Sequence, residues 1–177
     1  QPEVTDIIGS GLRDEEEILS IAASMEHLSE HPLAEAIVKY AEEEKVTLQE
    51  VGDFKAIPGH GVEGKIGKEK YYLGNRALMG NIVGLNVGIL EKKITRLEDN
   101  GKTVMILANE SEILGIVAVA DTLKETTVEA VSRLQKMGME IFMITGDNER
   151  TAKAIAKQAG IKNVLAEVLP EDKANEI

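Results

Sequence analysis

A threonine, a glycine and an aspartate stand together where the chain could hold a phosphoryl group. Thr145-Gly146-Asp147 follows an apolar run that predicts a buried strand, and a helical pattern begins directly after it. Ligands of α/β sheets bind at the carboxyl ends of the strands, where the first N–H groups of a helix also attract anions. The alternative is an ordinary loop in which Asp147 or Asn148 caps the helix.

Two charged residues in the same half of the chain could assist that threonine. Lys173, in the segment Leu169-Pro-Glu-Asp-Lys, lies one turn into a helix predicted after the next strand, and its ammonium group could neutralise phosphate charge. Asp121, in Asp121-Thr-Leu-Lys, directly follows another apolar run. Each has a simpler interpretation, because Lys173 could be a solvated surface lysine and Asp121 a helix cap.

A second constellation, in the first half of the chain, has the chemistry to bind an adenine ring. Glu26 ends one predicted helix and His31 begins the next, so a tight corner could bring both side chains to one mouth. A carboxylate accepts hydrogen bonds from an exocyclic amine, and an imidazole can stack on a ring or hydrogen-bond to it. Gly59 and Gly61 offer bare backbone to a flat ligand, and Asn75 could donate or accept nearby.

Each of these five residues also has a purely structural interpretation. Glu26 could be a solvated acid and His31 the cap of the second helix. The two glycines could simply form a turn, and Asn75 could be the N-cap of the segment that follows it. Taken one at a time, each residue is better explained by its structural interpretation than by a ligand site.

The elements that would position these residues are of two kinds. Helices are predicted at 14–28 and from Pro32, as a hairpin with a tight corner, and short Gly-punctuated segments at 49–74 are typical of an antiparallel meander. A helix at 87–99 and a strand pair within 102–120 complete an α+β unit. Beyond it, strands and helices alternate, which indicates a parallel sheet. The elements expected there are helices at 124–137 and 148–159, strands at 140–144 and 163–166, and a helix beginning at Pro170.

The composition is that of a globular protein and argues against several functions. Hydrophobic residues make up 43% and charged residues 29% of the chain, and the net charge of -11 argues against nucleic acid, which needs a clustered basic surface. There is no cysteine, and the three histidines lack a persuasive ligand spacing, so no metal site is predicted. No run approaches a membrane span and no signal peptide opens the sequence, so we expect a soluble piece in a reducing compartment.

The second constellation, which has the chemistry to bind adenine, resembles a known family signature. Ser29-Glu30-His31-Pro32-Leu33 looks like the SEHPL motif of the heavy-metal-transporting (CPx-type, copper- and silver-like) P-type ATPases, where it lies in the nucleotide-binding domain. Glu26, Gly59, Gly61 and Asn75 fall where that family places the rest of its adenine pocket. The combination is specific, because other P-type ATPases bind adenine with different residues.

The later motifs resemble the phosphorylation domain of the same pumps, in the family's order. They are Asp121-Thr-Leu-Lys, Thr145-Gly-Asp-Asn and Leu169-Pro-Glu-Asp-Lys. The resemblance covers nearly the whole chain. It implies that Thr145 and Lys173 contact the phosphoryl group, and that Asp121 and Asp147 lie near the nucleotide.

The resemblance also implies a fold. A nucleotide-binding domain at 11–118, an α+β unit with an antiparallel sheet and a helical hairpin, would be inserted in a phosphorylation domain of the α/β, haloacid-dehalogenase-like fold. That second domain would comprise 1–10 and 119–177 and be incomplete, because two or three parallel strands are too few for a stable doubly wound sheet. We therefore expect two units joined by two adjacent connections near residues 10 and 118.

Two family motifs are missing from the sequence. Neither the DKTGT motif of the phosphorylated aspartate nor the GDGxND motif of the Mg²⁺-binding acid occurs. We therefore expect a fragment that binds ATP or ADP without turnover. Its parent would be an ATP-driven heavy-metal efflux pump, of copper or silver, that forms an aspartyl phosphate with Mg²⁺. The fragment would be its cytoplasmic part, and its partners the pump's membrane helices and actuator domain.

Two other functions remain open at this point. A soluble phosphohydrolase of the same superfamily, with residues 11–118 as its cap, would explain Thr145 and Lys173 equally well. That alternative leaves the set of Glu26, His31, Gly59, Gly61 and Asn75 unexplained. The other possibility is a non-catalytic nucleotide-sensing module.

Overall fold

A six-stranded antiparallel sheet forms the centre of the structure. The computed structural model describes residues 2–121, 123 and 125–168. The strand order in the large sheet is β1-β6-β5-β4-β3-β2. The bounds are β1 Pro2–Gly9, β2 Val51–Ile57, β3 Gly61–Ile66, β4 Glu69–Gly74, β5 Thr103–Asn109 and β6 Ile113–Asp121.

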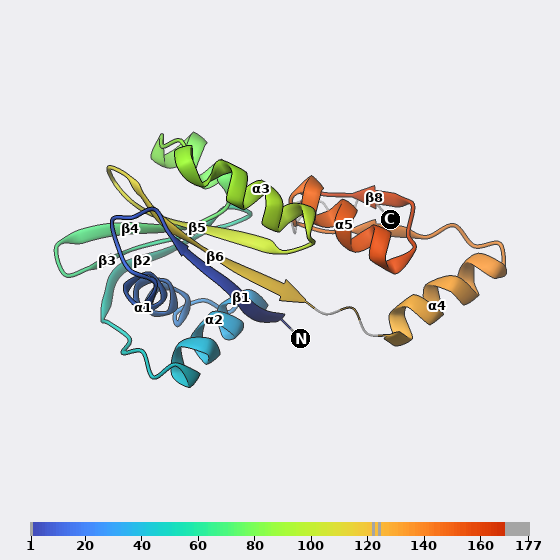
Figure 1. The fold of residues 1–177 in the computed structure, drawn as a ribbon, viewed down its shortest axis with the longest axis horizontal. Helices are drawn as coiled ribbons and strands as arrows, with labels where there is room; N and C mark the ends of the chain where they lie inside the picture. Colours follow the sequence, from blue (N-terminus) through green and yellow to red (C-terminus); the bar gives the residue numbers. More distant parts are fainter. Residues whose placement is uncertain (1, 122, 124, 169–177) are drawn as a thin grey trace.

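Helices cover both faces of this sheet (Figure 1). On one face lie α1 (Glu15–Glu26) and α2 (Pro32–Glu43), and on the other lie α3 (Glu91–Asp99), the π-helical η1 (Leu78–Val83) and the 3-10 turn η2 (Gly88–Leu90). β6 has both faces buried: Val117 and Val119 pack toward α1 and α2, whereas Ile116 and Ala118 pack toward α3. Its apolar residues are therefore continuous rather than alternating.

The helical hairpin forms where the sequence predicts it. The Asp14 side chain caps α1 by accepting a hydrogen bond from the Glu17 N–H, and three glutamates occupy the first turn, where the helix dipole favours them. Pro32 stands at the start of α2, where a missing N–H costs nothing. The expected α+β unit with an antiparallel sheet and a helical hairpin is confirmed.

The second unit contains two parallel strands, β7 (Phe142–Ile144) and β8 (Asn163–Leu165). They are joined through α5 (Glu149–Ala159), and α4 (Glu125–Lys136) precedes them. Figure 1 shows α4 extending away from the large sheet and α5 beside the end of α3. The helix expected from Pro170 lies outside the described residues. No helix in the described ranges is long and apolar enough to span a membrane.

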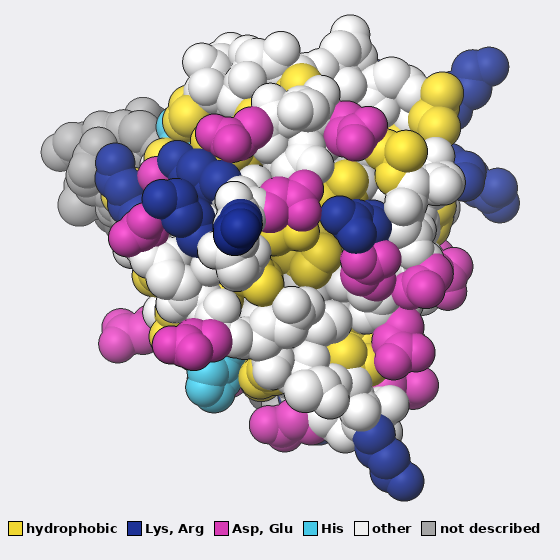
Figure 2. Space-filling model, turned by 90° about the vertical axis from the view of Figure 1, so that its left-hand side faces the viewer, with side chains coloured by type: hydrophobic (Ala, Val, Ile, Leu, Met, Phe, Trp, Pro, Cys, Tyr) yellow, Lys and Arg dark blue, Asp and Glu magenta, His cyan; other side chains and the backbone are white. Residues whose placement is uncertain are grey.

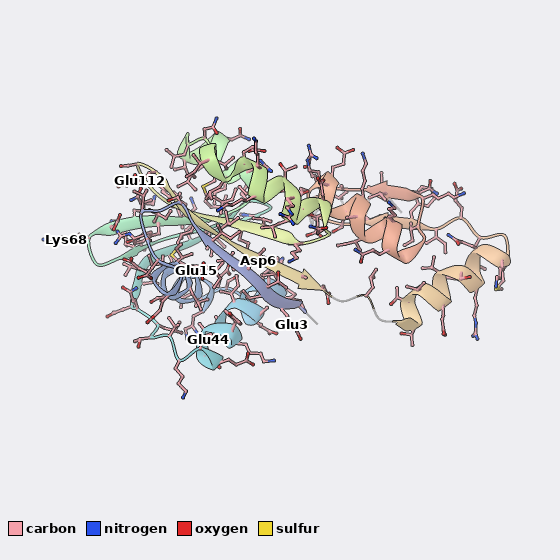
Figure 3. All side chains as sticks on the ribbon, viewed as in Figure 1. Glu3, Asp6, Glu15, Glu44, Lys68 and Glu112 are labelled. Carbon is pink, nitrogen blue, oxygen red and sulfur yellow. The ribbon has the colours of Figure 1, made fainter. Side chains whose placement is uncertain are left out.

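The opening residues depart from the expected division of the chain. Residues 2–9, which we expected to belong to the second unit, form β1 and pair with β6 along their whole length, from Pro2 opposite Asp121 to Gly9 opposite Gly115. Figure 3 shows Glu3 and Asp6 along this strand. The chain thus enters and leaves the large sheet at neighbouring positions, but at residues 2 and 121 rather than 10 and 118.

The hairpin tips at the other end of the sheet carry charges of both signs. Lys68 and Glu112 lie at this end, on the β3–β4 and β5–β6 turns (Figure 3). Figure 2 looks at the same end and shows acidic and basic side chains interspersed around small apolar areas. A polar network links its strands, because Glu69 accepts hydrogen bonds from Tyr71, Asn109 and Arg13.

Candidate nucleotide-binding site

Glu26 is a buried carboxyl group without a full set of hydrogen-bond partners. It is the last residue of α1 and its exposed fraction is 3%, so the solvated-acid interpretation is wrong. Its Oε2 has no hydrogen-bond partner among the described residues. Burial raises the pKa of Glu26 to about 7, although a hydrogen bond from Ser29 acts in the opposite direction. Near neutral pH this group can therefore be either an acceptor or a donor.

His31 caps the second helix and remains exposed. Its Nδ1 accepts a hydrogen bond from the Leu33 N–H, with 3.2 Å between the nitrogens. The helix-cap interpretation therefore describes its local role. In a neutral ring an accepting Nδ1 leaves the proton on Nε2. The exposed ring can thus cap the helix and still present a donor and a flat face to a ligand.

The two glycines and Asn75 form one cluster where β3 begins and β4 ends. The Asn75 Nδ2 donates to the Gly59 carbonyl oxygen at 2.8 Å, and its Oδ1 accepts from the Leu78 N–H at 2.9 Å. The backbone N–H of Asn75 donates to the His60 carbonyl oxygen at 2.9 Å. The turn is held in place by the strand next to it.

Gly61 is required by the close approach of the two strands. Its φ of +147° is in the region that favours glycine, and a side chain there would collide with the Leu73 carbonyl and lie 2.6 Å from the Gly74 Cα. Gly59, with φ +73° in the turn itself, has exposed backbone. The turn interpretation therefore describes Gly59, whose backbone is open to a ligand, whereas Gly61 is the first residue of β3.

The five residues gather in two groups. Glu26 and His31 belong to the α1–α2 corner, whereas Gly59, Gly61 and Asn75 lie where the β2–β3 turn meets the end of β4. Met25, next to Glu26, packs against β3, because a β-carbon at Gly64 would lie 3.1 Å from its sulfur. A groove of ≈ 260 Å³ opens at the corner. It includes neither the turn nor His31, so the expected single mouth for Glu26 and His31 is not seen, and it is lined by Glu26, His27, Ser29, Ala34, Glu35, Val38, Lys39 and Glu42.

Sequence reasoning missed an arginine that anchors the Asn75 loop. Arg76 binds Glu91 through Nη1 at 2.6 Å and Glu98 through Nη2 at 3.0 Å. Glu98 is 3% exposed, whereas the Arg76 side chain is 34% exposed, so this ion pair between the loop and α3 is buried on the glutamate side only. The position of an arginine directly after Asn75 could have suggested a charged contact near the site. No local pattern indicated that its partners lie on a helix farther along the chain.

The loop Thr145-Gly146-Asp147, which we call the phosphate-type loop, is held by hydrogen bonds among its own residues. The Thr145 hydroxyl donates to Asp147 Oδ2 at 2.8 Å, and the Asp147 N–H donates back to the Thr145 oxygen at 3.1 Å. Asn148 is the N-cap of α5 and accepts from the Thr151 N–H at 3.0 Å. The cap is therefore Asn148, which leaves the Asp147 carboxylate for other contacts.

The remaining predicted residues are less well placed. Asp121 is exposed at the end of β6, opposite Pro2. Lys173 lies outside the described residues. Within the described ranges no three His, Cys, Asp or Glu side chains group as a metal site would require.

Comparison with known proteins decides the family. The model of the haloacid dehalogenase-like hydrolases matches residues 1–177. The chain belongs to that family. The probable copper-importing P-type ATPase A of Enterococcus hirae is 46% identical over 177 residues, and the copper-exporting P-type ATPase of Staphylococcus aureus is 47% identical over 178. The resemblance to heavy-metal P-type ATPases is thereby confirmed.

This haloacid dehalogenase-like chain is much shorter than those relatives. It is covered to 99% and 100% by the two alignments but spans only 24% and 21% of the relatives' own lengths. Among solved structures, the catalytic domain of the CPx-ATPase CopB-B, from a study of nucleotide binding, matches with a TM-score of 0.73 at 30% identity. That match covers 99% of this chain and 59% of the other.

Proposed function

We propose that this chain recognises ATP for a copper pump that works through an aspartyl phosphate. The single observation that carries the proposal is the state of Glu26. A buried oxygen without a hydrogen-bond donor is costly and uncommon, and it is satisfied when a ligand donor arrives. An exocyclic amine beside a ring nitrogen, as adenine has, suits a carboxyl group that can accept and donate.

The other residues would complete the adenine contact. The exposed ring of His31 would stack on the base or hydrogen-bond to it from the same corner. The backbone at Gly59 and Gly61, fixed by Asn75, would approach the ligand from the side of the β2–β3 turn. Arg76 supports this arrangement by holding the loop to α3.

The phosphate end of the nucleotide would face the second unit. Thr145 would donate to a phosphoryl oxygen and Lys173 would offset its charge, with Asp121 and Asp147 near the nucleotide. Among the described residues no three His, Cys, Asp or Glu side chains group as a site for Mg²⁺ made by this chain alone would require. The cation would be held by the phosphates and by other parts of the pump.

The proposal also assigns each of the two units to a domain of the parent protein. The large-sheet unit, residues 2–121, would be the nucleotide-binding domain, and the βα unit would be part of the phosphorylation domain. Both would stand on the cytoplasmic side of a membrane pump. The sequence has no DKTGT motif, so the chain would bind nucleotide without turning it over. The names of both relatives support copper as the cargo.

Chemical-shift mapping with ATP tests the adenine part of this proposal. We expect the largest backbone amide shifts at the α1–α2 corner and at the Gly59–Gly61 turn. Shifts confined to 145–151, without any at the corner, would instead favour a phosphohydrolase whose large-sheet unit is only a cap.

A test of the pump part of the proposal needs a complete pump. The experiment replaces the corresponding segment of the S. aureus exporter with residues 1–177, which are 47% identical to it. We expect the chimera to retain copper-stimulated ATPase activity. An inactive chimera that still binds ATP and inserts correctly would count against the assignment to copper transport.

A further inference from the structure

The loop Thr145-Gly146-Asp147 is held by a residue of the other unit. Thr103, the first residue of β5, donates its hydroxyl hydrogen bond to Asp147 Oδ1 at 3.0 Å. Thr145 donates to the other oxygen of the same carboxylate at 2.8 Å. Asp147 thus joins a hydroxyl of the large-sheet unit to a hydroxyl of its own loop.

The surroundings of Thr103 form a fitted contact, which we call the α3–β5 corner (residues 99–103). The Lys102 carbonyl accepts from the Thr151 hydroxyl at 2.8 Å, and Thr151 is fully buried. Gly101, with φ +77°, lies against α5, where a β-carbon would be 3.5 Å from Ile155. An exposed ion pair between Asp99 and Arg150, at 3.3 Å, lies at the edge of the contact.

The hydrogen bonds fix where the hydroxyl proton of Thr145 points. A threonine hydroxyl has one proton to donate, and here that proton goes to Asp147. While this bond exists, Thr145 cannot donate to a phosphoryl oxygen. Because Thr103 occupies the second oxygen of Asp147, the carboxylate is held in the orientation that keeps the Thr145 proton engaged.

We propose that Thr103 is a positioning residue that keeps the phosphate-type loop closed until the α3–β5 corner moves away from it. When the corner separates from α5, Asp147 loses one of its two hydroxyl donors and can rotate. The Thr145 hydroxyl is then able to donate to a ligand. The device rests on the phosphate role proposed above for Thr145, and it couples that role to the relative placement of the two units.

The test uses the 177-residue chain without nucleotide and compares three variants. Thr103→Val removes the hydroxyl at nearly constant volume, Thr103→Ser keeps it, and Thr47→Val removes an exposed threonine hydroxyl elsewhere. We expect Thr103→Val to speed amide hydrogen exchange over residues 146–151 about tenfold or more, the effect of losing one hydrogen bond to a charged group. We also expect it to shift the ¹³C resonance of the Asp147 carboxyl group, while Thr103→Ser and Thr47→Val keep the wild-type values.

Two results would overturn the proposal. The first is wild-type exchange and an unshifted Asp147 carboxyl resonance in folded Thr103→Val. The second is a Thr103→Ser chain that behaves like Thr103→Val, which would mean that packing rather than the hydroxyl matters. Should Thr103→Val not fold, Thr103→Ala serves in its place. ATP titration of the same chains examines the adenine site separately, so its failure would not alter either outcome.

Discussion

The side-chain amide of Asn75 donates to the carbonyl oxygen of Gly59, 2.8 Å away, and so ties the end of β4 to the turn before β3. The same side chain accepts from the Leu78 N–H, which stabilises the start of the following helical segment. One residue thereby serves both the backbone presented to the proposed ligand and the local fold.

Asn75→Asp separates these two roles. The aspartate keeps an acceptor for the Leu78 N–H but places a second acceptor against the Gly59 carbonyl. We expect ATP affinity to fall about tenfold, equal to about 1.4 kcal/mol, because the turn is repelled rather than held. Calorimetric titration measures the loss, and Asn86→Asp, at an exposed asparagine that accepts from the Gly88 N–H, is the control. Equal ATP affinities of Asn75→Asp and Asn86→Asp would show that the Gly59–Gly61 turn does not contribute to nucleotide binding.

His31 can be tested in the same manner, since its cap and its ring are separable. His31→Ala should lower stability by about 0.5–2 kcal/mol through loss of the cap. It should also raise the ATP dissociation constant about five- to thirtyfold, the equivalent of about 1–2 kcal/mol of ligand contact. His31→Asn restores a capping side chain without an imidazole, so it should recover the melting temperature but not the affinity.

Neighbouring Glu30→Ala is the control for general effects at the corner. It should leave both quantities near those of the wild type. A His31→Asn chain with wild-type affinity would remove the ring from the nucleotide contact and leave His31 as a cap alone.

Stability should depend on pH through Glu26. Its folded-state pKa of about 7 lies above the ordinary value of 4.5, so the folded state binds more protons between these two pH values. Stability is then highest below pH 4.5, as far as this group is concerned, and falls as pH rises toward 7. The full difference is about 3 kcal/mol at 1.36 kcal/mol per pKa unit.

Urea unfolding between pH 4.5 and pH 8 measures this slope. Glu26→Gln carries no titratable group, so its stability relative to the wild type should increase across that interval. Glu35→Gln, at an exposed position of α2, should run parallel to the wild type. A Glu26→Gln curve that is parallel as well would show that the carboxyl group is not held in a desolvated site.

Arg76 should contribute more to the free energy of unfolding than a cation in an exposed ion pair, such as Lys153. Arg76→Ala leaves Glu98, 3% exposed, without its cation. Because the Arg76 side chain is itself 34% exposed, we expect a cost between the about 1 kcal/mol of an exposed pair and the about 3–5 kcal/mol of a fully buried one. Lys153→Ala removes an exposed partner of Glu149 and should cost at most about 1 kcal/mol. Denaturant melts compare the two. Adding Glu98→Gln to Arg76→Ala should recover part of the loss, and failure to recover any would assign the cost to packing.

The helical hairpin and the meander were predictable because their signals are local. Pro32, the acids of the first turn of α1 and the glycine punctuation of 49–74 each act within a few residues. β1 was missed for a physical reason. Its pairing with β6 shifts register between Val4 and Asp6, so a bulge breaks the alternation of inward and outward residues that marks a strand.

The residues of the candidate site could be predicted from the sequence, but their burial and their hydrogen-bond partners could not. The sequence places Glu26 at the end of a helix, yet a buried and a solvated glutamate look alike there. The partners of Arg76 and the contact of Thr103 with Asp147 bridge 22 and 44 positions along the chain. Such pairs follow from the packing of α3 and α5, which no local pattern encodes.

Calorimetric titration of the chain with ATP and with ADP, each with and without Mg²⁺, tests the central claim most directly. The identified contacts address adenine and its surroundings, so we predict similar, modest affinities for both nucleotides, little effect of Mg²⁺ and no release of phosphate above background. Glu26→Ala should weaken both affinities alike, since alanine removes the hydrogen-bond acceptor and donor together. A large preference for ATP, or steady phosphate release, would contradict the account and place the chemistry on other residues of this chain.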